Sequence, residues 1–92
     1  MSEAPATLHI VTRLRGATLL AMAADRAAGR RVQVLLLHDE VYRHDPSRFP
    51  AVDRFLVGAD DCRRRGLEPP AGAVEYPAIV EAIASASRVI SW

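Results

Sequence analysis

The chain contains little cysteine, few aromatic residues and no lysine. It has 92 residues with one cysteine, and aromatic residues make up 5% of the total. One cysteine excludes an internal disulfide, and one cysteine with three histidines is poor material for a structural zinc site. All 12 basic residues are arginine, and with 11 acidic residues they give a net charge of +1. No overall field therefore attracts nucleic acid or an anionic membrane.

Signals for targeting and for membrane insertion are also missing. Residues 1–6 lack the basic segment and apolar run of a signal peptide, and no apolar stretch approaches membrane-spanning length. We therefore expect a cytoplasmic protein that makes no membrane contact. With 50% apolar and 25% charged residues, the composition predicts a single globular domain over residues 1–92. So short a chain leaves apolar surface for a partner, which makes an oligomer the expected state.

No glycine-rich phosphate-binding loop is present. The turn after the first expected strand, residues 12–16, reads TRLRG and holds a single glycine. This excludes a dinucleotide fingerprint and a P-loop at that position. We expect no cofactor.

The sequence does contain alternating strand and helix patterns. Runs of β-forming residues predict four strands, at 7–11, 32–37, 53–57 and 88–92. Helix-forming segments predict three helices, at 17–28, 59–65 and 76–86. Two polar stretches with prolines predict loops, at 39–50 and 68–73. Without hairpin signals, this order predicts a small three-layer α/β fold with a parallel sheet, flavodoxin-like or Rossmann-like. Because helix 17–28 has few polar residues, we expect it to be buried around much of its circumference.

Polar side chains concentrate in the loop that follows the second strand. His38, Asp39, Glu40, His44 and Asp45 come just after the carboxyl end of a strand, where ligands dock in open α/β sheets. Their spacing matches no metal motif, so we expect no metal site. A solvated loop, an acid–base site and a subunit contact remain open, and for His38 we favour the subunit contact.

Cys62 is the one candidate nucleophile. It lies in the first turn of a short helix, where the helix dipole favours a thiolate, but Asp60 and Asp61 precede it and raise its pKa. We interpret Cys62 as an inert packed thiol and keep a reactive thiolate as the alternative. The three arginines at 63–65 lack interleaved aromatic residues, so direct RNA binding is not expected. Trp92 packs either over the core or against another subunit.

Taken together and in order, several segments resemble the DsrH/TusB family of sulfur-relay subunits. The matching segments are Leu8-His9, the run VLLLHDEVY at 34–42, the run DDCRRRGL at 60–67, Tyr76 with Val80, and the closing Ser91-Trp92. The Arg-Gly-Leu segment, followed at this distance by a Tyr-x-x-x-Val helix and a terminal Trp, is the most specific part of the set.

This resemblance implies a DsrE-like fold and assembly with homologues of the DsrE/TusD and DsrF/TusC types. Such complexes pass persulfide sulfur between cysteines, for 2-thiolation of the wobble uridine in tRNA or for dissimilatory sulfur oxidation. The sulfur-carrying cysteine generally belongs to the DsrE/TusD-type partner. This chain would then be a non-catalytic subunit and not an enzyme by itself, with His38, Tyr76 and Trp92 as candidate interface residues.

The chain departs from the family pattern at three places. Residues 17–28 lack the cysteine that some DsrH members carry on the first helix, which favours the tRNA-thiolation branch. Glu40 stands where glycine is common, and Cys62 stands where an aliphatic residue is usual. Two alternatives therefore stay open: a persulfide carrier that uses Cys62, and a stand-alone homo-oligomeric binding module that uses the loop around His38.

Overall fold

The computed structural model describes residues 5–92, and within that range the strands form one five-stranded sheet in which every neighbouring pair is parallel. The strands are β1 (Ala6–Val11), β2 (Arg31–Leu36), β3 (Arg54–Gly58), β4 (Ala73–Val74) and β5 (Arg88–Ser91). Their order across the sheet is β4-β3-β2-β1-β5. The α/β class and the parallel sheet predicted from the sequence are confirmed.

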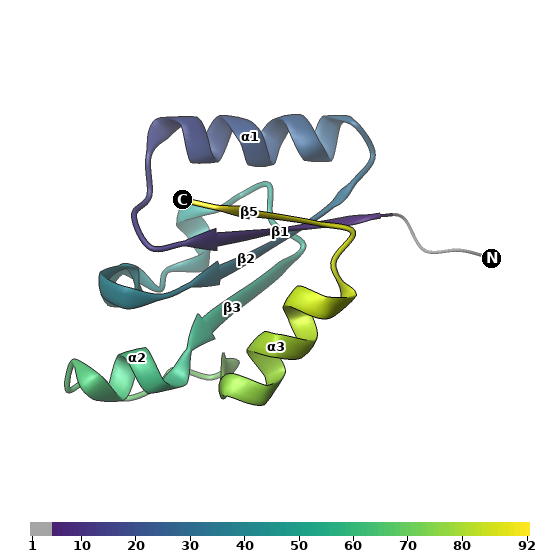
Figure 1. The fold of residues 1–92 in the computed structure, drawn as a ribbon. Coiled ribbons are helices and arrows are strands. Elements are labelled where there is room, and N and C mark those ends of the chain that lie inside the picture. The colour runs from purple at the N-terminus through teal and green to yellow at the C-terminus, as the bar shows by residue number, and fades with distance from the viewer. Residues whose placement is uncertain (1–4) are drawn as a thin grey trace.

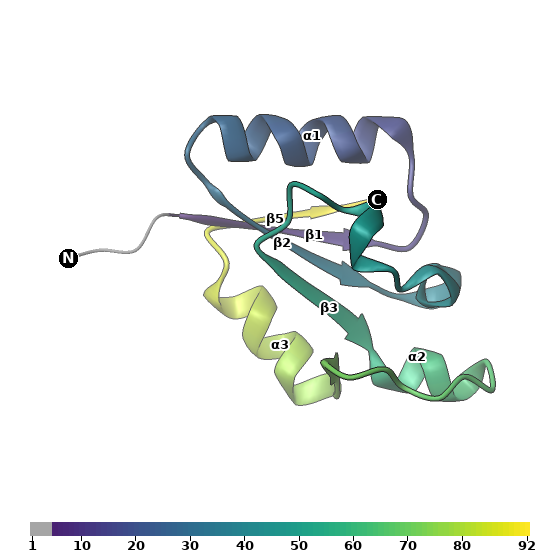
Figure 2. The same cartoon turned by 180° about the vertical axis from the view of Figure 1, so that it is seen from behind.

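Helices cover both faces of this sheet. Helix α1 (Gly16–Ala27) lies on one side and helix α3 (Tyr76–Ser85) on the other, as Figure 1 and the reverse view in Figure 2 show. Three short elements complete the fold: α2 (Ala59–Arg64) and two 3₁₀ turns, η1 (His38–Arg43) and η2 (Pro46–Arg48). Because parallel crossovers are right-handed, the reversal of direction between β4 and β5 places α3 opposite α1.

Each face of the sheet has its own apolar cluster, because side chains alternate along a strand. On the α1 side, the cluster includes Val34 and Val57 from the sheet, Met22 from α1 and Cys62 from α2. On the α3 side, Leu8, Leu35 and Leu56 of three neighbouring strands pack against Ala82 of α3. The valine- and leucine-rich strand β2 is buried on both faces, as a central parallel strand must be.

The strand order reverses beside β1. The chain steps from β1 through β2 and β3 to β4 in one direction, and β5 then returns to the far side of β1. Thr12 marks this position, since its backbone N–H and its hydroxyl both donate to the Trp92 carbonyl oxygen. Loops at the carboxyl edge of such a sheet are where ligands dock in doubly wound folds.

Three details differ from the sequence-based expectations. The predicted loop 39–50 contains most of η1 and all of η2, and the short strand β4 begins at the end of the predicted loop 68–73. The prediction that α1 is buried around much of its circumference is wrong for this chain. Its buried residues are Thr18, Met22 and Asp25, so two of its polar residues, Thr18 and Asp25, face the sheet, whereas Arg26 is exposed. Among the described residues, no helix is both long enough and apolar enough to span a membrane.

Candidate functional site

A buried polar network joins β1, α1 and the end of the chain. His9 points from β1 toward α1 and is fully buried, and its Nε2 lies 2.9 Å from Oδ2 of Asp25, which is 3% exposed. A buried polar group is costly unless it has a partner, and this pairing satisfies both side chains. The network thus explains why two polar residues are tolerated in the core.

Trp92 fixes which ring nitrogen of His9 carries the proton. The indole Nε1–H can only donate, and it lies 3.0 Å from His9 Nδ1. Nδ1 is therefore the acceptor, and Nε2–H donates to Asp25. The sequence left Trp92 between a core position and a subunit contact, and the structure places it against the core, half-buried and bonded to His9.

Two arginines complete the network at its outer rim. Arg30 Nη1 donates to Asp25 Oδ1 over 3.1 Å, and Arg88 Nη2 donates to the same oxygen. Burial acts to raise the pKa of Asp25, but the hydrogen bonds from His9 and Arg30 and the charge of Arg88 outweigh it and hold that pKa below its usual value. This fully paired arrangement ties α1 to β5.

Cys62 is fully buried in the core cluster under α2. Burial raises the pKa of its thiol, and the nearby charge of Asp61 raises it further, against smaller opposite effects of Arg63 and Arg65. Because the thiolate is the nucleophile and reactivity also requires exposure, this environment suppresses the chemistry of the thiol. The geometry suits packing and gives no support to a reactive Cys62.

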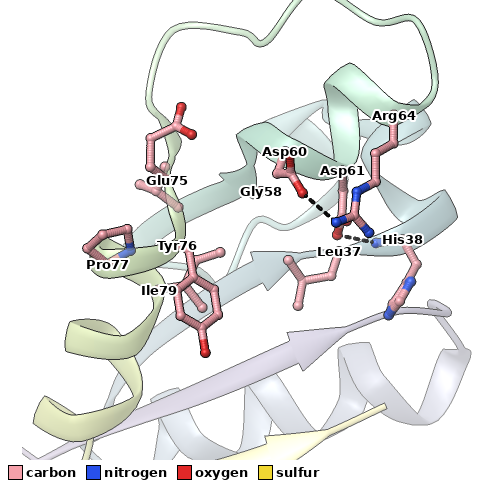
Figure 3. A pocket seen from close by; sticks show the side chains of 11 residues that line it. Leu37, His38, Gly58, Asp60, Asp61, Arg64, Glu75, Tyr76, Pro77 and Ile79 are labelled. Carbon is pink, nitrogen blue, oxygen red and sulfur yellow. Dashed lines mark hydrogen bonds and ion pairs between the residues drawn. The ribbon is translucent and has the colours of Figure 1, made fainter.

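A pocket of about 610 Å³ opens at the carboxyl edge of the sheet, between α2 and the start of α3 (Figure 3). It is lined by Leu37, His38, Gly58, Asp60, Asp61, Arg64, Val74, Glu75, Tyr76, Pro77 and Ile79. Two residues selected from the sequence, His38 and Tyr76, are brought together here, whereas Trp92 and Cys62 lie outside the lining. The volume is in the range of small-molecule sites.

The backbone at this pocket is held in an uncommon conformation. His38 has a φ of 53°, in the left-handed region that residues other than glycine rarely adopt. Its backbone N–H donates to Asp61 Oδ2 over 2.8 Å, which compensates part of the cost (Figure 3). Gly58 lies close to Leu37, and a Cβ added to Gly58 would lie 2.7 Å from Leu37 Cδ2. Strained backbone of this kind is found at functional sites.

The charged groups at the rim are largely engaged with one another. Arg64 Nη2 lies 3.0 Å from Asp60 Oδ2, and Arg63 donates to Glu75, whose pKa this contact holds below its usual value. The lining combines apolar residues with His38, Tyr76 and the charged residues, and it contains no serine, cysteine or lysine. Such a lining can bind an apolar group and orient it by hydrogen bonds, and it supplies no assembled nucleophile.

The rest of the predicted polar cluster does not converge on a site. Asp39 pairs with Arg65, Glu40 accepts from the backbone N–H of Leu14, and His44 contacts the Val41 carbonyl oxygen at 2.9 Å. Across residues 5–92, no group of three or more His, Cys, Asp or Glu side chains is placed to hold a metal ion. The cluster therefore works through separate local contacts.

Sequence reasoning missed His9 and Asp25 as a pair. The signal was present, because His9 interrupts an apolar strand and Asp25 is the one acidic residue of a helix made largely of alanine and leucine. Two polar residues on apolar elements predict a buried contact between them. Their partnership with Trp92 needed the strand order, since 83 positions separate that residue from His9.

Comparison with known proteins gives no further guide. No family model matches the chain, and neither a curated protein nor a solved structure matches it.

Proposed function

We propose that the chain is a non-catalytic, cytoplasmic subunit of a sulfur-relay complex of the DsrEFH/TusBCD type, with a DsrE-like fold. In this role it supports persulfide transfer by a DsrE/TusD-like partner, within an assembly that also contains a DsrF/TusC-like homologue. The sulfur serves 2-thiolation of the wobble uridine in tRNA. The proposal starts from the sequence resemblance, and the parallel α/β sheet is compatible with it.

Residues that carry the resemblance have clear structural roles. His9 and Trp92, from opposite ends of the resemblance, hydrogen-bond to each other. Gly66 follows α2 with a φ of 70°, a conformation that favours glycine and explains the Arg-Gly-Leu segment. These roles support a shared fold without deciding the partner.

The observation that carries the non-catalytic role is the state of the thiol. Persulfide transfer moves the outer sulfur of one cysteine persulfide to the thiolate of the next cysteine and releases the first cysteine as a thiolate. Cys62 is the only cysteine, is fully buried and has a raised pKa. A chain whose one thiol is buried and has a raised pKa needs a cysteine-bearing partner for this chemistry.

The test is reconstitution with a cysteine-bearing homologue of the DsrE/TusD type. We expect the two to co-purify, and we expect persulfide delivery by the partner, followed by mass spectrometry, to be faster with this chain present. Cys62→Ser serves as the matched variant and should support transfer as well as the natural chain. No association and no effect on transfer would refute the proposal.

A second candidate is a small binding module, and the pocket beside His38 and Tyr76 favours it. It predicts ligand binding by the isolated chain, which the relay role does not require. Fragment screening by NMR, with Tyr76→Ala as the binding-deficient variant, separates the two. Stable addition of sulfur to Cys62 would instead support the persulfide-carrier alternative.

A further inference from the structure

The two helices that cover the sheet each expose an apolar surface. The charged residues beside these two surfaces have opposite signs. On α1 the exposed apolar residues are Ala17, Leu19, Leu20, Ala23, Ala24 and Ala27. At 100° per residue they form one continuous stripe, about half a turn away from the sheet-facing residues. Leu20 is 73% exposed. In a single copy, this helix presents its apolar side to water.

Helix α3 lies on the opposite face of the sheet (Figures 1 and 2), and it exposes a second apolar surface. Tyr76, Val80 and Ile83 follow one another at helical spacing along one flank and are 73%, 46% and 40% exposed. Val89 of β5 pairs with Leu8 and so shares this face, and it is 39% exposed. A helix this apolar is normally buried on more than one side.

Charge decides which surfaces can meet. The acidic residue of α1, Asp25, is buried, and the exposed charges at the ends of α1 are arginines, among them Arg15 and Arg26. Helix α3 contains no basic residue and exposes Glu81. Within residues 5–92, neither Arg15 nor Glu81 has an ion-pair partner, whereas Arg26 pairs with Asp53.

Pairing like with like is therefore unfavourable. Two α1 surfaces would offer Arg15 no free acidic partner, because Asp25 and Asp53 are already paired, and two α3 surfaces would offer Glu81 no basic partner. An α1 surface against an α3 surface opposes arginine to glutamate. It also sets the alanines of α1 against the larger Tyr76, Val80 and Ile83, which favours close helix packing.

We propose that the α1 surface of one copy of this chain docks on the α3 surface of the next, in a head-to-tail contact. Because the two surfaces lie on opposite faces of the sheet, the contact is heterologous, and repetition of it gives a ring or an open chain of subunits. This inference does not rest on the sulfur-relay role, and either can stand without the other.

The experiment uses one variant for each surface. Leu20→Glu places a carboxylate on the α1 stripe and Val80→Glu places one on the α3 stripe, both at exposed positions, so the fold is expected to persist. Tyr42→Glu, at an exposed aromatic of η1, is the matched control. Circular dichroism checks the fold, and light scattering coupled to size exclusion measures the mass over a concentration series.

The natural chain and Tyr42→Glu should both exceed the 10.0 kDa of one chain, and the two surface variants should each be monomeric. Mixing the two variants is the decisive step. Each keeps the surface that the other has lost, so one intact contact forms and the mixture should yield a species of two chains and no larger assembly.

Three results would overturn the inference. One is a natural chain that stays monomeric at every concentration, even if it assembles with a sulfur-relay homologue. Another is loss of assembly in only one of the two surface variants, which would indicate a like-with-like contact. The third is a mixture of the two variants in which both remain monomeric.

Discussion

Asp25 shows how one buried carboxylate makes stability depend on pH. Its pKa is held below the ordinary 3.8, so the unfolded chain takes up a proton before the folded one as the pH falls. The stabilisation is complete above that ordinary value and is lost as the pH falls through the lower folded value.

We predict that Asp25→Asn lowers the free energy of unfolding at neutral pH by about 2 kcal/mol, because hydrogen bonds to a charged group are lost. It should also flatten the acid limb of the pH–stability curve. Urea titrations of both proteins between neutral and acid pH measure the two effects. Other acidic residues share the acid limb, so the difference between the proteins is decisive, and parallel curves would contradict this role of Asp25.

The backbone of His38 has a left-handed conformation, which is unfavourable for a residue that carries a side chain. A non-glycine residue in the left-handed region costs about 1–2 kcal/mol. We predict that His38→Gly raises the free energy of unfolding by roughly 0.5–1 kcal/mol, after the entropy cost of glycine in the unfolded chain. Chemical denaturation measures the change.

His44→Gly is the matched comparison for that substitution. The φ of His44 is −76°, and its ring contacts the Val41 carbonyl oxygen, so the same substitution should destabilise there. Equal effects at the two positions would show that the left-handed backbone of His38 carries no cost. If the His38 imidazole helps to hold a ligand, its glycine variant gains stability and loses binding.

At the level of elements, α1 reverses the usual arrangement of polar and apolar residues. We predict that Leu20→Ala changes the free energy of unfolding by less than about 0.5 kcal/mol in the monomer, because Leu20 lies mostly in water. Met22→Ala, two positions away and buried, should cost about 2–5 kcal/mol. Thermal or urea unfolding at low protein concentration compares them. A large loss for Leu20→Ala would mean that its side chain stabilises the single chain.

The same helix marks the limit of what the sequence predicts. The composition of residues 17–28 predicts a helix at the right place in the chain. Which side of that helix faces the sheet depends on the hydrogen bond between Asp25 and His9. The strand at 32–37 was predicted because a near-continuous apolar run determines it. Strand β4 was missed because its two residues hold no pattern and pair only once β3 is in place.

Two of the residues that line the pocket were selected from the sequence, but the pocket that they share was not predicted. His38 and Tyr76 were selected separately, one after a strand and one at the start of a helix. They line the same pocket because β2, β3 and β4 are neighbours and end at the same edge of the sheet. Asp61 could not be assigned from the sequence, since its contact with the His38 backbone depends on that same strand order.

For the whole molecule, the Cys62 thiol is a probe of global unfolding. Cys62 packs in the cluster that joins the sheet to α1 and α2. We predict that alkylation of Cys62 is slow in native buffer and accelerates with urea in parallel with the loss of circular dichroism, because exposure needs core unfolding. Mass spectrometry follows the modified fraction, with fully denatured protein as the reference. Rapid labelling under native conditions would indicate local opening of α2.

The pairing of β1 with β5 places two segments side by side that are made at very different times during translation. Residues 7–10 emerge 81 residues before their partners at 88–91. Closing so long a loop slows folding. Until residues 88–92 leave the ribosome, one edge of β1 stays unpaired and His9 lacks its indole partner.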